Sequence, residues 1–180
     1  TKVTGAPNGR VGNRSRFEHP QRTTGPTSTP APLHELVGTI PPSDVHYERH
    51  HAGVPTIDPA KHTLTIHGLV DRPLRLSLDE LQRLSRTDLR VRHDCVEGWS
   101  AVASWHGVRL AEIARVAGMR REARCVEFAT FDVDEDGRPY RSSWDLASAL
   151  HPQTILAYGM NGELLGPGHG APLRVYAAPV

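Results

Sequence analysis

The chain has 180 residues, with 21 Lys plus Arg against 20 Asp plus Glu. This length suits one domain with a substantial core and leaves no room for two ordinary domains. The near-even charge balance gives no reason to expect nucleic acid as a partner. The sequence has no apolar run near the roughly 18 residues of a membrane helix, so no membrane span is expected.

Residues 1–32 are rich in Gly, Pro, Thr, Ser, Asn and Arg and show almost no hydrophobic period. Such a segment cannot bury enough apolar surface to offset the entropy lost on ordering. It is predicted to be a flexible or surface-draped N-terminal arm. Residues 33–180 are predicted to form the folded domain.

The first half of this domain shows two strand patterns and one helix pattern. Apolar and polar residues alternate over residues 62–70 and again over residues 89–94, which predicts two strands. Between them, Ser77 is a suitable N-cap for a short helix over residues 78–84. The second strand leads directly into Cys95. Because strand side chains alternate between faces, only one of the two residues Arg92 and His93 can lie on the cysteine's side.

In the second half, a helix is predicted over residues 110–117, where Gly118 marks its C-terminal end. A strand is predicted over residues 124–130, with Cys125 as an ordinary core residue. The two cysteines of the chain give no framework pattern, and both are expected to be reduced.

Three more elements complete the domain. Ser143 is expected to cap a helix over residues 143–150. Residues 154–160 read as a buried strand, followed by Asn161-Gly162, a strong signal for a tight turn. Residues 169–176 are expected to return as the last strand. The order of strands and short helices predicts an α+β, β-rich domain.

The most informative stretch is residues 95–100, which read Cys-Val-Glu-Gly-Trp-Ser. One interpretation is a structural cysteine in a hydrophobic corner, because free Cys is among the most buried residue types. The other is a functional thiol held at the end of a strand. Glu97 is expected to face water rather than to accept a proton, as loop carboxylates usually do.

A second dense group lies at residues 46–51, where four of the six residues are His or Arg. His46 and His50 are four residues apart, a spacing that lets two imidazoles bind zinc from one helical face. Gly53 and Pro55 disfavour a long helix there, and no third ligand follows from the spacing. A solvated polar loop is the alternative.

Residues 95–100, with Trp105-x-Gly-Val-x-Leu110 downstream, resemble the cofactor cysteine segment of the sulfite oxidase superfamily of molybdopterin enzymes. The likeness is greatest to its short bacterial branch of methionine-sulfoxide-reductase type. In that family the cysteine thiolate is the only protein ligand to molybdenum, and a thiolate suits a metal already bound by dithiolene sulfurs. The resemblance implies Mo-molybdopterin as cofactor and Cys95 as the metal ligand and a catalytic residue.

Residues 47–59 are similar to the Phe-x-Arg-Asn-His, Val-Pro, Asp-Pro segment of sulfite oxidases, and more closely to that of sulfane and sulfite dehydrogenase catalytic subunits. In the family this loop contacts the pterin, and its arginine points into the substrate pocket. Arg49 is therefore expected to be catalytic, recruiting an anionic substrate. His50 stands where sulfite oxidases have Asn. The cofactor-binding residues implied by this segment are Tyr47, Glu48, Arg49, His50 and His51.

Further along, the family order of an apolar strand, Asn-Gly-Glu and His-Gly-x-Pro-x-Arg is repeated. Thr130, His169 and Arg174 match family positions that hold the pterin and its phosphate. The resemblance spans residues 33–180 and implies the mixed, β-rich sulfite-oxidase-type fold with short helices. The family ordinarily continues beyond the last residue of this chain with a phosphate-clamping segment, so the domain is expected to lack that C-terminal segment.

The resemblance implies an oxidoreductase that transfers an oxygen atom and two electrons at a small sulfur substrate. Sulfite oxidation, with electrons leaving to a haem or cytochrome partner, is favoured. The Cys-Val-Glu-x-Trp pattern leans toward sulfoxide reduction, and a metal-free binding module that keeps the scaffold is a further alternative. Because relatives are often exported, the periplasm is the expected location and the cytoplasm the alternative.

Overall fold

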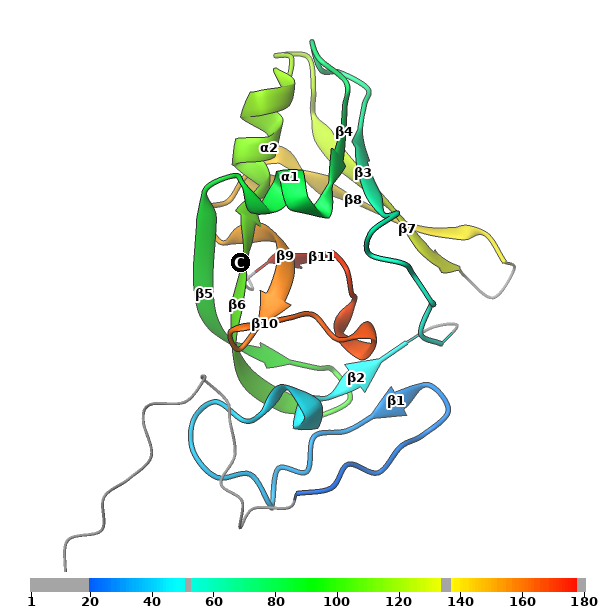
Figure 1. Ribbon diagram of the computed structural model, residues 1–180, viewed down its shortest axis with the longest axis vertical. Coiled ribbons are helices and arrows are strands. Elements are labelled where there is room, and N and C mark those ends of the chain that lie inside the picture. Colours follow the sequence, from blue (N-terminus) through cyan, green and yellow to red (C-terminus); the bar gives the residue numbers. More distant parts are fainter. Residues whose placement is uncertain (1–19, 51–52, 134–136, 178–180) are drawn as a thin grey trace, which may run out of the picture.

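The computed structural model describes residues 20–50, 53–133 and 137–177. Its centre is an antiparallel sheet in which β9 pairs with β6 along one edge and with both β10 and β11 along the other, while β5 pairs with β6 (Figure 1). The strands are β5 (Arg86–Asp94), β6 (Ser100–Arg109), β9 (Thr154–Met160), β10 (Glu163–Leu164) and β11 (Arg174–Ala177). The predicted β-rich fold is confirmed.

Three pairs of strands and short helices surround this sheet in the described structure (Figure 1). The pairs are β1 (Ser28–Thr29) with β2 (Glu48–Arg49), β3 (Thr63–Ile66) with β4 (Leu74–Ser77), and β7 (Cys125–Val133) with β8 (Pro139–Asp145). The helices are α1 (Leu78–Gln82), α2 (Leu110–Ala117) and α3 (Leu146–Ala149), with 3-10 turns η1 (Ser43–Val45) and η2 (Pro167–His169).

Local signals explain the first two helices. The Ser77 hydroxyl accepts a hydrogen bond from the Glu80 N–H, and the Glu80 carboxylate accepts one from the Ser77 N–H at 2.8 Å, a capping box that starts α1. Helix α2 ends at Gly118, which takes a left-handed φ of 69°. Residues 110–117 form the predicted helix. Its apolar stripe packs on the sheet and joins the apolar core, which consists of Leu81, Val108, Leu110, Ile113, Ala149, Leu156 and Tyr158.

The Asn161-Gly162 pair forms the predicted tight turn between β9 and β10. Asn161 has a φ of 52° and Gly162 a φ of 83°, both in the left-handed region that these two residue types tolerate best. The Asn161 side chain is buried, and its amide donates to the Pro41 carbonyl and the Ser43 hydroxyl, each at 3.1 Å. The turn therefore also fixes the segment that leads into β2.

Strand β9 is buried along its whole length and serves both faces of the sheet. Leu156 and Tyr158 face the apolar core, whereas Ile155 packs on the opposite face. Gly159 lies opposite His106 but the next pair is Ala157 with Gly107, so Tyr158 is an extra residue in β9. The bulge returns Met160 to the face of Ile155.

Three local predictions were wrong in detail. Ser143 lies in β8, and the helix begins at Leu146 with Asp145 as its N-cap. Cys125 is exposed rather than buried, because the alternate residues Val126 and Phe128 turn toward the apolar core and leave residue 125 on the outer face of β7. Both cysteines are free, as expected.

The third concerns the last strand, which was predicted to begin at His169. Pairing with β9 starts only at Arg174. Gly170 takes a left-handed φ of 91°, and Pro172 has no N–H to donate to a neighbouring strand, so this stretch forms η2 and a turn instead.

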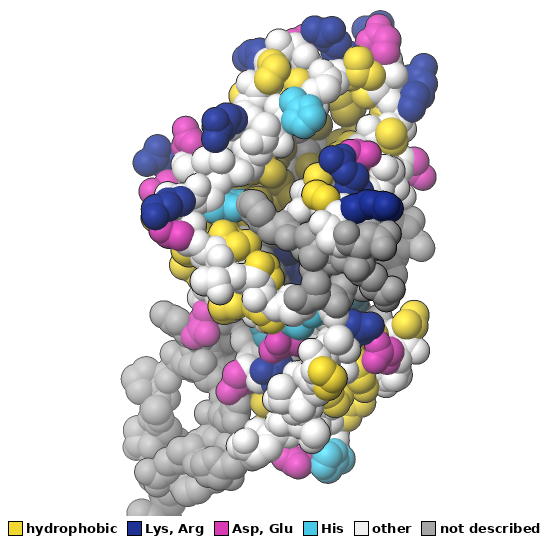
Figure 2. Space-filling model, turned by 90° about the vertical axis from the view of Figure 1, so that its right-hand side faces the viewer, with side chains coloured by type: hydrophobic (Ala, Val, Ile, Leu, Met, Phe, Trp, Pro, Cys, Tyr) yellow, Lys and Arg dark blue, Asp and Glu magenta, His cyan; other side chains and the backbone are white. Residues whose placement is uncertain are grey.

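Charged side chains of both signs are spread over the face shown in Figure 2, in keeping with the near-even charge balance. None of the helices within the described ranges is long and apolar enough to cross a lipid bilayer.

Candidate active site

Cys95 directly follows β5 and opens the turn that leads into β6. Its N–H donates to the Trp99 carbonyl at 2.8 Å, and the Gly98 N–H donates to the Cys95 carbonyl at 2.9 Å. The side chain is half-buried and packs in a small cluster with Tyr47 and Trp99. The thiol is therefore neither sealed in the apolar core nor fully exposed, an arrangement that suits a functional cysteine better than a structural one.

The neighbouring β5 residues follow the strand alternation. Arg92 is exposed and pairs with Asp94 at 2.8 Å, while His93 turns inward. The His93 ring lies 5.7 Å from the Tyr47 ring and 5.6 Å from the Tyr176 ring, measured between centroids. His93 is thus the residue of the pair that lies on the cysteine's side.

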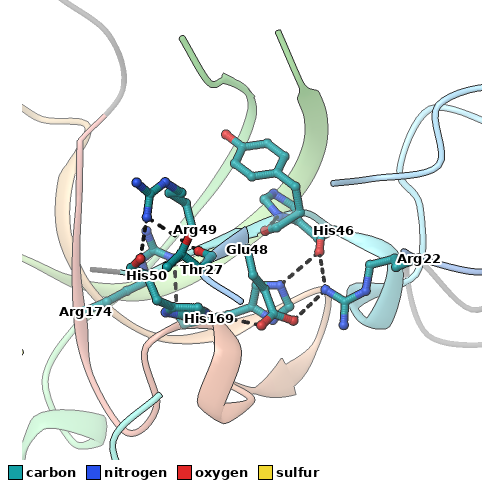
Figure 3. A network of polar contacts seen from close by, with 9 residues as sticks. Arg22, Thr27, His46, Glu48, Arg49, His50, His169 and Arg174 are labelled. Carbon is teal, nitrogen blue, oxygen red and sulfur yellow. Dashed lines mark hydrogen bonds and ion pairs between the residues drawn. The ribbon is translucent and has the colours of Figure 1, made fainter. Parts of the chain in front are cut away.

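The segment predicted to contact the pterin forms β2 and lies beside residues 20–32. In Figure 3, the Arg22 guanidinium donates to Glu48 Oε1 at 2.5 Å and to the His46 carbonyl at 2.8 Å. The His50 N–H donates to the Thr27 carbonyl at 2.8 Å. The described part of the predicted arm therefore lies against this segment, while the boundary at residue 32 stays a prediction.

Glu48 is the centre of this contact. Its side chain is only 16% exposed, and the His50 imidazole lies 3.3 Å from Oε2. Burial alone would raise the pKa of Glu48, but hydrogen bonds from Arg22 and His50 lower it. The η2 turn packs closely against the same carboxylate: a Cβ on Gly168 would lie only 2.2 Å from Glu48 Oε2. A larger residue at 168 would have to displace the Glu48 carboxylate from its partners.

Arg49 reaches toward the Cys95 turn. Its Nε donates to Glu97 Oε1 at 2.7 Å, and the two side chains are 39% and 40% exposed. Its Nη1 also donates to the Thr27 carbonyl at 3.5 Å and to the His50 carbonyl. Glu97 is exposed, as predicted, and it is also paired with this arginine.

Arg174 has a different environment. Its guanidinium donates to the His169 carbonyl at 3.1 Å (Figure 3). It also lies 4.9 Å from the centre of the Trp105 ring. Within the described structure it pairs with no carboxylate. Burial lowers the pKa of Arg174, because the charged form is costly away from water. A half-buried cation of this kind is a natural binding point for an anion.

Arg174 belongs to a group of aromatic and histidine side chains that we call the site cluster. Its members are His46, Tyr47, His93, Trp105, His169, Arg174 and Tyr176, joined by ring contacts and by the Arg174 stacking on Trp105. Burial is the main cause of their pKa shifts: it lowers the pKa of His46 to about 4 and raises the pKa of Tyr47 and of Tyr176 to about 12. These three side chains are therefore neutral at pH 7.

The site cluster contains buried polar atoms that have no hydrogen-bond partner in the described structure. They are His46 Nε2, Tyr47 Oη, His93 Nδ1, Trp105 Nε1 and Tyr176 Oη. Leaving such an atom unpaired costs about 1–3 kcal/mol, so a group of them indicates a ligand. Tyr47 Oη, Trp105 Nε1 and Tyr176 Oη can donate, and with the guanidinium of Arg174 they fit a large anionic group rich in hydrogen-bond acceptors. His46 Nε2 is an acceptor, because the neutral ring donates through Nδ1 to the Tyr47 carbonyl. The residues present therefore fit a molybdopterin and its phosphate.

The structure brings most of the predicted site residues to one end of the molecule. Two are exceptions: Thr130 lies in β7, where its hydroxyl donates to the Tyr140 carbonyl at 3.4 Å, and His51 lies outside the described residues. Across the described ranges, no three His, Cys, Asp or Glu side chains gather at a spacing that could hold a metal ion, such as the zinc considered for His46 and His50. The binding roles of all these residues stay predictions.

Sequence reasoning missed Arg22, Trp105 and Tyr176 as members of the site. Tyr176 carried a usable signal, because it lies two residues after Arg174 in a strand and so shares its face. A groove beside the cluster is lined by Val54, Pro55, Thr56, Ile57, Pro167 and Ala171. It joins the predicted Val-Pro segment to the η2 turn.

Comparison with known proteins gives a consistent picture. Residues 51–179 match the family model described as the oxidoreductase molybdopterin binding domain. The chain is 38% identical over 119 residues to the putative protein-methionine-sulfoxide reductase subunit YedZ1 of Azospira oryzae, covering 66% of this chain and 43% of that protein. It is 31% identical to the sulfite oxidase of Arabidopsis thaliana, covering 83% and 46%.

Among solved structures, the sulfane dehydrogenase SoxCD from Paracoccus pantotrophus superposes with a TM-score of 0.78 at 26% identity. The match covers 92% of this chain and 48% of that chain. The present chain thus spans less than half the length of each of these three proteins.

Proposed function

Because the chain belongs to the oxidoreductase molybdopterin binding domain family, we propose that it acts as a molybdenum-dependent oxidoreductase on a small sulfur substrate, with sulfite as the favoured one. The observation that carries this proposal is the meeting of the Cys95 turn, two arginines and a set of unpaired buried polar atoms at one end of the molecule. Hydrophobic packing alone gives no reason for these polar groups to gather at one place.

Each group has a role toward the cofactor. Cys95 would be the metal ligand, since its half-buried thiol lies at a strand end and is held by backbone hydrogen bonds. The bound cofactor would supply oxygen-atom transfer coupled to a two-electron change at the metal. His46 and Tyr47 would bind its polar atoms, and Arg174 would bind its phosphate. Because burial keeps His46 neutral, that imidazole adds no charge next to Arg174.

Sulfite is supported by the positive charge at the site. Arg49 lies beside the Cys95 turn, and Arg174 has no carboxylate partner among the described residues. Fixed cations hold and orient an anionic substrate. Passage of the electrons to a haem protein, and a location in the periplasm, are part of the proposal and rest on the family alone.

Sulfoxide reduction is the second candidate, and one specific contact favours it. Glu97 offsets the charge of Arg49, so this part of the site suits a neutral sulfoxide as well as an anion. The relatives include proteins named for each of the two reactions.

The test is metal analysis of protein purified from a host that makes molybdopterin. We expect nearly stoichiometric molybdenum, and turnover of sulfite with a one-electron acceptor. In Cys95→Ser the metal should be lost to a greater degree than the ~10–100-fold that weakened outer contacts cause. Cys125→Ser, which changes an exposed cysteine, is the matched control and should retain the metal. A well-folded, metal-free wild-type protein would instead support the binding-module alternative, and zinc is measured in the same run.

A further inference from the structure

Glu97 lies two residues after Cys95, in the turn that carries the thiol. Its carboxylate accepts a hydrogen bond from Arg49 Nε at 2.7 Å, across 48 residues of sequence. The turn is held by the hydrogen bond from the Cys95 N–H to the Trp99 carbonyl at 2.8 Å. Glu97 therefore connects an ordered turn to the arginine that faces it.

The Arg49 guanidinium has little freedom. Nε is bound by Glu97, and Nη1 donates to the carbonyls of Thr27 and His50. In the part of the chain that the structure describes, Nη2 has no hydrogen-bond partner. One nitrogen of the group thus remains available to a substrate.

The charges of the two site arginines are treated differently. The positive charge of Arg49 is offset by Glu97 at hydrogen-bond distance, whereas Arg174 contacts a carbonyl and an aromatic ring and no carboxylate of the described residues. Two other acidic side chains near the site are already paired, Glu48 with Arg22 and Asp94 with Arg92. Glu97 is therefore the group that decides how much positive charge Arg49 presents.

We propose that Glu97 is a positioning residue for Arg49 and sets the preference of the site for substrate charge. It holds the guanidinium beside the Cys95 turn and competes with a sulfur oxyanion for its positive charge. A neutral sulfoxide oxygen needs only the hydrogen bond that Nη2 still offers. This inference rests on the proposed function and adds to it a reason why one site can accept both substrate classes.

The direct test is Glu97→Gln in the molybdenum-loaded protein. Glutamine keeps an oxygen that can accept the hydrogen bond from Arg49 but removes the negative charge. We expect the KM for sulfite to fall about fivefold, as befits one partly exposed charge pair, with kcat within about twofold. The KM for methionine sulfoxide should stay the same. A fall for both substrates, or for neither, overturns the proposal.

A second readout does not depend on turnover. Isothermal titration with sulfate, a non-reacting oxyanion, should show an affinity about fivefold higher in Glu97→Gln than in the wild type at low salt. The difference should shrink as the ionic strength rises, because the pair is partly exposed. If the proposed function fails and neither substrate turns over, the titration still decides whether Glu97 controls anion binding at this arginine.

Two controls separate the pair from general charge effects. Asp88→Asn removes a carboxylate that pairs with Arg86 at the far end of β5, and it should leave the sulfate affinity unchanged. In an Arg49→Gln background, Glu97→Gln should no longer change that affinity, since a residue that acts through Arg49 has no effect without it. An equal gain in either control contradicts the proposal.

Discussion

Two buried regions of this molecule differ in how their polar atoms are satisfied. The apolar core around Ile113 contains almost only carbon, and its packing follows from the spacing of apolar residues in α1, α2 and β9. The site cluster also contains deeply buried side chains, with Trp105 fully inaccessible and Tyr176 2% exposed, but several of its polar atoms have no hydrogen-bond partner among the described residues. Burial alone therefore does not distinguish the two regions, whereas the group of polar atoms without described partners does.

The largest expected effect concerns the apolar core. Ile113→Ala removes a side chain that is 2% exposed, and the cavity left behind should lower the free energy of unfolding by about 2–5 kcal/mol. Urea denaturation measures the loss. Molybdenum per folded chain should remain at the wild-type level, because Ile113 lies outside the site cluster. Loss of metal from the folded variant would show that the cavity at residue 113 also distorts the site cluster.

The next effect concerns the site cluster and pH. The pKa of His46 is about 4 in the folded protein against 6.5 for the free side chain, so the unfolded chain binds the extra proton between these values. The free energy of unfolding should therefore fall as the pH falls from about 6.5 to about 4, by about 3 kcal/mol from this residue. Denaturation curves across this range measure the slope.

In His46→Gln that part of the slope should disappear. The same substitution at the exposed His34 is the matched control, because its imidazole is surrounded by solvent in both states. An unchanged slope in His46→Gln would mean that the imidazole is not held in its neutral form.

A smaller effect, of opposite sign, sharpens the comparison. Tyr176→Phe removes a buried hydroxyl that has no hydrogen-bond partner in the described part of the chain, so the cofactor-free protein should gain about 1 kcal/mol in free energy of unfolding. The retained molybdenum should fall, because a donor for the cofactor is lost. Thermal melting and metal analysis test both parts. The exposed Tyr140 offers the control Tyr140→Phe, and a less stable Tyr176→Phe protein would show that the hydroxyl is already paired.

The smallest effect lies outside both regions. Arg86 and Asp88 form an ion pair at 2.6 Å, but both side chains are more than half exposed. Solvent screens such a pair, so Arg86→Ala should change the free energy of unfolding by about 0.5 kcal/mol or less. A loss of stability comparable to that of Ile113→Ala would mean that the Arg86 side chain is buried against other residues in solution.

The sequence was sufficient where the signal is local. Ser77, Gly118 and the Asn161-Gly162 pair each specify the backbone within one turn, and α1, α2 and the turn after β9 form where predicted. It was insufficient where neighbouring strands decide the outcome. Cys125 lies in an apolar run, yet the β7–β8 pairing leaves it on the outer face.

The candidate site shows the same limit. Its motifs could be recognised from the order of short segments, but not their contacts. The Arg49–Glu97 pair joins residues 48 positions apart, and Arg22 comes from a segment with no hydrophobic period at all. Such contacts depend on how β1, β2 and the Cys95 turn are placed by the sheet, which no periodicity encodes.

The extra residue in β9 couples the stability of the apolar core to that of the site cluster. Strand β9 lies between them. With Tyr158 as the extra residue, Leu156 and Tyr158 face the apolar core, while Ile155 and Met160 pack with Trp105 and Tyr176 of the site cluster. A ligand bound at the site cluster is therefore expected to stabilise the apolar core as well. Cofactor binding is expected to raise the melting temperature of the entire chain in a single transition rather than to stabilise one end alone.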